Sequence, residues 1–184
     1  MAKTPLTVAG AEMLRAELHR LKTVDRPNTI AAIAEACDQR GADVPVMISG
    51  TITDKSGRLL SGQMPEAFWN SVRHAKPITI GFNCALGAKD LRAHIADIGR
   101  VADTLVCAYP NAGLPNEFGA YDESPEYMAG LIGEFARDGL VNIVGGCCGT
   151  TPDHTRAIVA AVGDVTPRHV PAPPARTRWS GLEP

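Results

Sequence analysis

The sequence predicts an α/β fold in which short parallel strands alternate with helices. Four runs of β-branched and small residues, typical of buried parallel strands, lie at 44–50, 78–84, 104–108 and 141–147. Their spacing is that of βα units, and helical patterns lie between them. A closed (β/α)8 barrel needs eight strands and about 250 residues, so the chain has the strands of half a barrel. An open α/β sheet is the competing architecture at this length.

The expected helices are defined by their caps and their apolar stripes. The clearest one runs from Ser124, a good N-cap, through Pro125 at the first helical position to Gly139 at its end. Further helices are expected at 11–22, 28–40, 65–75, 87–101 and 151–163. Beyond Gly163 the helical pattern fails and proline-rich sequence predicts an extended arm or linker.

Composition narrows the class of protein. The 184 residues suit about one domain, and 18 Lys+Arg against 20 Asp+Glu give a net charge of −2, which argues against nucleic-acid binding. We find neither an apolar run of membrane-spanning length nor the apolar core of a secretory signal. Five cysteines, an odd number, do not suit a disulfide scaffold. We therefore expect a cytoplasmic protein without nucleic-acid or membrane partners.

Three of the five cysteines follow the ends of predicted strands. Cys84 ends the second strand, and Cys147 and Cys148 end the fourth, so all three should meet at the carboxyl rim where α/β proteins place their sites. Three thiolates at one point suit Zn²⁺ in tetrahedral coordination, with the fourth position open as in catalytic sites. Neighbouring residues of a strand point to opposite faces, so the adjacent pair can converge only if glycines such as Gly146 and Gly149 break the strand.

Other interpretations of these cysteines stay open. The rim could be a glycine-rich turn with incidental thiols, or Cys147 and Cys148 could form a redox dithiol. Cys37, on a helical stripe, and Cys107, inside a strand, are expected to be inert core residues.

Polar residues at the same rim give weaker signals. Asp54 is either a solvated loop carboxylate or an acid/base group, and Asn111 is either a turn former or a metal ligand through its side-chain oxygen. Four histidines fall in helical patterns and are expected at the surface: His19, His74, His94 and His154.

Four segments, in this order along the chain, resemble the homocysteine-binding domain of cobalamin-dependent methionine synthase. They are VMISGTITD at 46–54, GFNCALG at 81–87, PNAGLP at 110–115 and GGCCGTTP at 145–152. The terminal SGLEP at 180–184 resembles the segment that leads to the folate-binding domain, which favours methionine synthase over betaine–homocysteine methyltransferase.

The resemblance implies a TIM barrel whose zinc is held by Cys84, Cys147 and Cys148. Asn111 matches the position that takes the fourth site until the substrate thiol displaces it. The reaction would be methyl transfer from methylcobalamin to the sulfur of homocysteine. Because the chain has no Asp-x-His-x-x-Gly corrinoid motif, cobalamin and methyltetrahydrofolate would reach it only through other domains or chains.

The resemblance covers only the last four βα units of that barrel. We expect residues 25–163 to form the half-barrel, 1–24 to be an atypical N-terminal segment whose residues 1–20 do not resemble the missing strands, and 164–184 to form the arm. Lys22 stands where the family has a glutamate before Thr23. We therefore expect half of the substrate pocket to be missing. Another chain could complete the barrel, the chain could pair with a second copy of itself, or the chain could be a truncated product whose barrel stays incomplete. The alternative function is a catalytically inactive zinc-binding remnant or truncated fragment.

Overall fold

The structure is a computed structural model, and its description covers residues 7–20, 23, 24, 28, 35, 45–53, 56–172, 178 and 180–183. The chain forms two compact units, residues 1–44 and 45–184, which we describe separately. Within the first, helix α1 (Val8–Arg20) starts three residues before the predicted helix. The helix expected at 28–40, with Cys37, lies outside the described residues. In the described part of the chain, no helix is long and apolar enough to cross a membrane.

The second unit is built on a parallel sheet of four strands. They are β1 (Met47–Gly50), β2 (Thr79–Gly87), β3 (Leu105–Asn111) and β4 (Ile143–Val144). The strands lie side by side in chain order, and every neighbouring pair is parallel. Consecutive strands of a (β/α)8 barrel have this order, and the described sheet lacks the reversal of a doubly wound sheet. The α/β prediction is confirmed.

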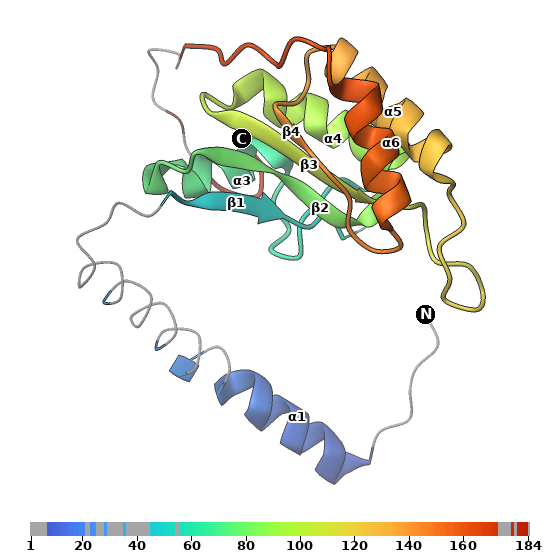
Figure 1. Ribbon diagram of the computed structural model, residues 1–184. Helices are drawn as coiled ribbons and strands as arrows, with labels where there is room; N and C mark the ends of the chain where they lie inside the picture. Colours follow the sequence, from blue (N-terminus) through green and yellow to red (C-terminus); the bar gives the residue numbers. More distant parts are fainter. Residues whose placement is uncertain are drawn as a thin grey trace. The chain divides into compact units, whose positions relative to one another are not determined.

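The helices follow the strands as predicted. They are α3 (Pro65–Val72) with the 3-10 turn η2 (Arg73–Ala75), α4 (Ala88–Val101), α5 (Pro125–Arg137) and α6 (Pro152–Val162). Helix α4 packs on β2 and β3, and each helix from α3 to α6 packs on the next. Figure 1 shows α4, α5 and α6 on one side of the sheet. The hydroxyl of Ser124 caps α5 by accepting a hydrogen bond from the Tyr127 amide, as its sequence position predicts.

The two faces of the sheet differ in burial. Ile80, Phe82 and Val106 point to the helices and form a fully buried core with them. Successive side chains of a strand alternate between faces, so Met47 and Leu105, which flank Thr79 in register, lie on the other face. Met47 is 51% exposed and Leu105 is 37% exposed. On that second face the apolar side chains of Met47 and Leu105 are partly exposed on either side of Thr79, which is fully buried.

The fourth strand is much shorter than its sequence predicts. The run at 141–147 forms only Ile143–Val144. Beyond Val144 the chain still follows β3, because the amides of Gly145 and Cys147 donate to the carbonyls of Ala108 and Pro110. The glycines nevertheless release it from strand geometry before the cysteine pair, which is the break that the pair requires.

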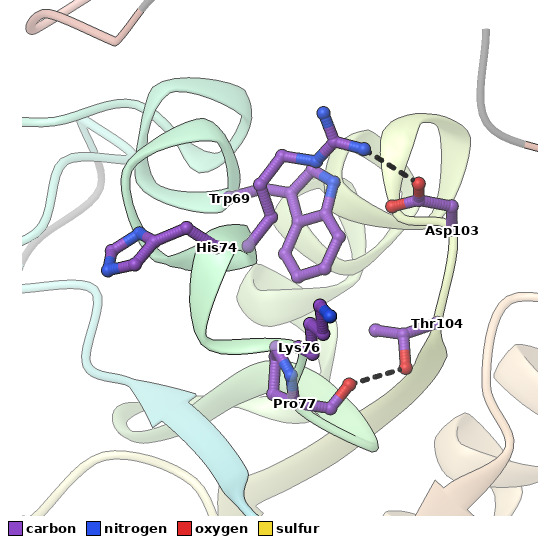
Figure 2. A pocket seen from close by; sticks show the side chains of 7 residues that line it. Trp69, His74, Lys76, Pro77, Asp103 and Thr104 are labelled. Carbon is purple, nitrogen blue, oxygen red and sulfur yellow. Dashed lines mark hydrogen bonds and ion pairs between the residues drawn. The ribbon is translucent and has the colours of Figure 1, made fainter.

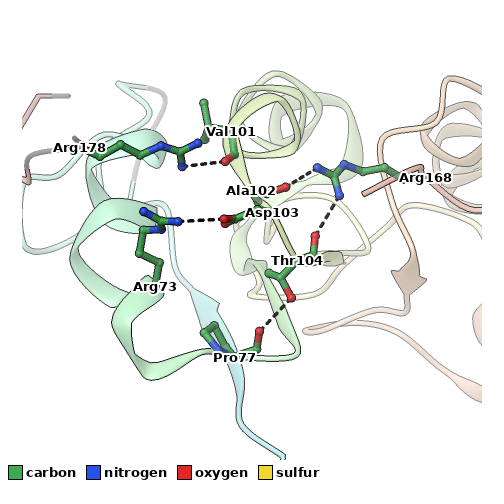
Figure 3. A network of polar contacts seen from close by, with 8 residues as sticks. All are labelled: Arg73, Pro77, Val101, Ala102, Asp103, Thr104, Arg168 and Arg178. Atoms are coloured by element: carbon green, nitrogen blue, oxygen red, sulfur yellow. Dashed lines mark hydrogen bonds and ion pairs between the residues drawn. The ribbon is translucent and has the colours of Figure 1, made fainter. Parts of the chain in front are cut away.

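Polar contacts fix the amino ends of the strands. The hydroxyl of Thr104 donates to the carbonyl of Pro77 at 2.8 Å and so links the approaches to β3 and β2 (Figure 2). Arg168, from the predicted arm, is only 6% exposed. Its guanidinium donates to the carbonyls of Ala102 at 2.7 Å and Thr104 at 3.0 Å (Figure 3), and also to that of Gly99. A cation at the end of α4 satisfies carbonyls that the helix leaves unpaired.

We predict that Arg168→Met lowers the free energy of unfolding by about 2–3 kcal/mol, because it removes charge-assisted hydrogen bonds to buried carbonyls. Urea denaturation of the purified chain measures this. Arg156→Met is the matched control, since the Arg156 side chain is 72% exposed and, among the described residues, pairs with Asp153 on its own helix; its effect should stay within about 0.5 kcal/mol. Equal denaturation midpoints for the two variants would show that the Arg168 contacts do not stabilise the fold.

Candidate metal centre

Three sulfur atoms converge at the carboxyl end of the sheet. The Sγ atoms of Cys84 and Cys148 are 3.5 Å apart, and those of Cys147 and Cys148 are 3.9 Å apart. All three sulfurs lie within 4.8 Å of one another, and all three residues are half-buried. The three sulfurs thus lie together, as the sequence predicts, although 63 residues separate Cys84 from Cys147.

A local break in β2 places Cys84. The register between β2 and β3 shifts after Asn83. Cys84 and Ala85 both have left-handed backbone angles, with φ of 61° and 59°. Residues other than glycine rarely adopt this conformation, and two in succession indicate a strained bulge that the surrounding fold maintains. The bulge turns the end of β2 out of the regular strand at the residue that supplies the sulfur.

The end of β3 places the other two cysteines. The Cys147 amide donates to the carbonyl of Pro110 at 2.8 Å. The Cys148 amide donates to Oδ1 of Asn111 at 3.0 Å, and the Cys148 carbonyl accepts from the Ala112 amide at 2.9 Å. Asn111 is only 2% exposed. Strand β3 therefore holds the cysteine loop at three successive points.

Tyr121 is a neighbour of the cysteines that the sequence pattern does not reveal. A hydrogen bond from its hydroxyl to the Cys148 sulfur raises the pKa of Tyr121, and burial and the cysteine charges raise it further. Gly149 makes this approach possible: it has a φ of 79°, and a Cβ there would lie 2.3 Å from the Cβ of Tyr121. Tyr121 lies in a long loop before α5, where no periodicity marks it.

His154 is buried, and the expectation of a surface residue was wrong for it. Its side chain is 6% exposed. Nδ1 accepts from the Thr151 amide at 3.2 Å, so Nε2 carries the proton and donates to the carbonyl of Glu123 at 2.9 Å. The capping position at the start of α6 turns the ring inward. His154 thereby links the cysteine loop to the loop that carries Tyr121.

The pKa values of Cys84 and Cys147 are shifted in opposite directions. Burial raises the pKa of Cys84, but hydrogen bonds from the Ala85 amide, the other two cysteines and Asn111 outweigh it, so the pKa is lowered. Burial, the hydrogen bonds with Cys84 and Cys148 and the charges of those two residues raise the pKa of Cys147 to about 11. Three thiolates therefore repel one another here unless a cation is bound among them.

The sulfur geometry fits a tetrahedral zinc ion. Zn–S bonds of ~2.3 Å at tetrahedral angles require S···S separations of roughly 3.8 Å. The separations of Cys148 from Cys84 and Cys147, 3.5 and 3.9 Å, lie on either side of that value. An all-sulfur donor set favours soft or borderline cations such as Zn²⁺ over Mg²⁺ or Ca²⁺. On geometry and donor type, the three cysteines could hold such an ion.

The remaining candidate residues separate into three groups. Cys107 is 1% exposed inside β3, where burial raises the pKa of its thiol, as expected of a core cysteine. Asn111 lies beside the sulfurs, but its Oδ1 already accepts the Cys148 amide, and its role as a fourth ligand stays a prediction. Asp54 lies outside the described residues.

Comparison with known proteins gives the family. The family profile of homocysteine S-methyltransferase matches residues 8–162. The chain belongs to the homocysteine S-methyltransferase family. Two crystal structures of the homocysteine methyltransferase MmuM from Escherichia coli are similar to it: the oxidized form (20% identity, TM-score 0.50, 70% of this chain and 40% of that chain covered) and the apo form (22%, 0.45, 71% and 44%). The chain thus spans less than half the length of the homocysteine methyltransferase that it matches.

We predict that Ala85→Gly raises the free energy of unfolding by about 0.5–1 kcal/mol. Relief of a left-handed residue is worth ~1–2 kcal/mol and exceeds the entropy cost of glycine, ~0.5–1 kcal/mol. Urea denaturation of the chain measures the change. Ala108→Gly, at a fully buried position in β3, is the control and should destabilise by about 1 kcal/mol. A loss of stability at both positions would contradict the strain assigned to Ala85.

Proposed function

We propose that this chain supplies the zinc-binding half of a homocysteine methyltransferase of the methionine synthase type. The single observation that carries the proposal is the convergence of the Cys84, Cys147 and Cys148 sulfurs at the carboxyl end of a parallel sheet. Active sites of barrel enzymes lie at this end. Membership of the homocysteine S-methyltransferase family supports homocysteine as the methyl acceptor.

The three cysteines would hold Zn²⁺ and leave one coordination position for substrate. A free thiol has a pKa of ~8.5 and is mostly protonated at pH 7. Zinc bound at the site would keep the homocysteine thiol as a thiolate, the nucleophilic form. The overall reaction would transfer the methyl group of methylcobalamin, supplied by another domain or chain, to that sulfur; the carbon–cobalt bond would break with its electron pair left on cobalt, and the thiol proton would go to solvent.

The chain's other residues position the ligands. Asn111 fixes the Cys148 backbone through its Oδ1, and its hydrogen bond to Cys84 favours the thiolate of that residue. Tyr121 packs against Gly149, next to Cys148, and its hydroxyl faces the Cys148 sulfur, the contact that raises the pKa of Tyr121. His154 links Thr151, which follows the cysteine loop, to the carbonyl of Glu123. These contacts preorganise the three sulfurs before any ion binds.

A second set of four βα units, from another chain or domain, would complete the barrel. The sequential strand order supports this, as do the partly exposed apolar side chains of Met47 and Leu105 and the edge positions of β1 and β4. The missing half would hold the amino acid part of homocysteine, and corrinoid and folate modules would deliver the methyl group. The alternative is a zinc-binding remnant that does not turn over.

The purified chain should contain about one zinc ion per molecule without added metal. We expect Cys84→Ala, Cys147→Ala and Cys148→Ala each to lose it, because two sulfurs do not hold zinc tightly at this site. Elemental analysis after gel filtration measures this. Cys107→Ala is the matched control, since Cys107 lies in the same sheet but away from the cluster, and it should keep its zinc. A folded wild-type chain without zinc would contradict the proposal.

Methyl transfer should require both halves of the barrel. The chain is assayed with homocysteine and methylcobalamin, alone and mixed with a chain that holds the first four βα units of a family member. We expect methionine only in the mixture, and none when Cys84→Ala replaces the wild type. Zinc bound but no methionine in either assay would favour the remnant. Reversible oxidation of Cys147 and Cys148 without any zinc would favour the redox dithiol.

A further inference from the structure

A second candidate site lies at the opposite end of the strands from the cysteines. A cavity of about 500 Å³ opens between the end of α3, the turn η2 and the approaches to β2 and β3. Its polar lining comes from Trp69, Arg73, His74, Lys76, Asp103 and Thr104. In Figure 2 the indole ring of Trp69 lies at the centre, with Asp103 to its right and Lys76 below it. Nothing in the methyltransferase proposal uses these residues.

The indole nitrogen of Trp69 has no hydrogen-bond partner in the described part of the chain. Trp69 is 2% exposed, and its Nε1 is buried without an acceptor among the residues that the structure describes. An indole N–H can only donate. Buried donors are nearly always paired, so this one calls for an acceptor that enters the cavity. The missing acceptor is the first sign of a ligand.

The charges around the cavity favour an anion. Arg73 and Lys76 are cations, and Asp103 is the one carboxylate among the described residues that line the cavity. Arg73 Nη2 is 2.9 Å from Asp103 Oδ2, and that carboxylate is 14% exposed. The ion pair holds the guanidinium in place, and its fork of five N–H donors leaves others for a ligand. Lys76 is exposed and supplies a second cation at the rim.

The frame of the cavity is fixed before a ligand binds. The Thr104 hydroxyl donates to the Pro77 and Ile78 carbonyls, both at 2.8 Å, and holds the two strand approaches together. Figure 3 shows Arg178 beside the Arg73–Asp103 pair, and it donates to the Val101 carbonyl at 3.0 Å. Donors held by a rigid frame bind an anion with little ordering cost.

We propose that this cavity binds the phosphate group of a small phosphorylated molecule. An indole N–H from α3, a guanidinium from the adjoining turn η2 and the ammonium of Lys76 directly after that turn line the space, and three such donors suit the several oxygens of a tetrahedral oxyanion better than a planar carboxylate. The cavity has the size of a small-molecule site and is larger than one phosphate, so the organic part of the ligand occupies the remaining space beside Trp69 and Pro77.

Isothermal titration calorimetry of the full chain with inorganic phosphate and with phenyl phosphate, in 0.15 M NaCl, tests this. We expect saturable binding of both and tighter binding of phenyl phosphate. Lys76→Gln should weaken binding about tenfold, the usual effect of losing one charge-assisted contact. Lys89→Gln, an exposed lysine on α4, is the matched control and should bind as the wild type does.

Trp69→Phe tests the unpaired indole nitrogen directly, because it keeps an aromatic ring and removes the N–H. Weaker phosphate binding with an unchanged thermal unfolding midpoint would support the proposal. Equal binding by wild type and Lys76→Gln would overturn it, as would acetate binding as tightly as phosphate or no saturation by either phosphate compound. Zinc content should be the same in wild type and Lys76→Gln, so this test is independent of the metal site.

Discussion

The need to bring three sulfurs to one point governs the architecture of this chain. Side chains of a regular strand alternate between faces, so an adjacent pair such as Cys147 and Cys148 cannot serve one ion from within a strand. The chain therefore leaves strand geometry twice at the same edge of the sheet. In β2 it does so through left-handed Cys84 and Ala85, and after β4 through a glycine-rich turn. Both breaks lower the local stability of the backbone and persist because the surrounding fold maintains them.

Strand β3 makes these two breaks compatible. It is the only described strand that pairs with both β2 and β4. Its last residues, Pro110 and Asn111, and Ala112 directly after it hold the cysteine loop, while the same strand pairs with the bulged end of β2. The metal centre and the fold are thus held by one element. The two ends of the sheet also differ in chemistry. The three cysteine sulfurs lie at the carboxyl end, whereas at the amino end Arg168 and Arg178 donate hydrogen bonds to carbonyls at the end of α4.

The elements with strong local signals matched their predictions closely. Proline at the first helical position fixed the start of α3, α5 and α6, and the predicted helix at 65–75 became α3 and η2 with the same limits. The predicted length of the fourth strand was wrong, because its apolar run continues into glycines whose conformation the run does not determine. The predicted exposure of His154 was wrong, because a polar side chain in the first turn of a helix can accept a hydrogen bond from the N-cap amide instead of facing solvent.

The sequence by itself determined the α/β class, the order of strands and helices and the identity of the three cysteines, because periodicity, caps and glycine-rich strand ends are local signals. Only the tertiary structure decided that β4 shrinks to two residues, that Asn111 uses its oxygen on the Cys148 amide and that Tyr121 reaches a sulfur. The same holds for the cavity around Trp69. These features depend on which segments far apart in the chain become neighbours, and packing alone settles that.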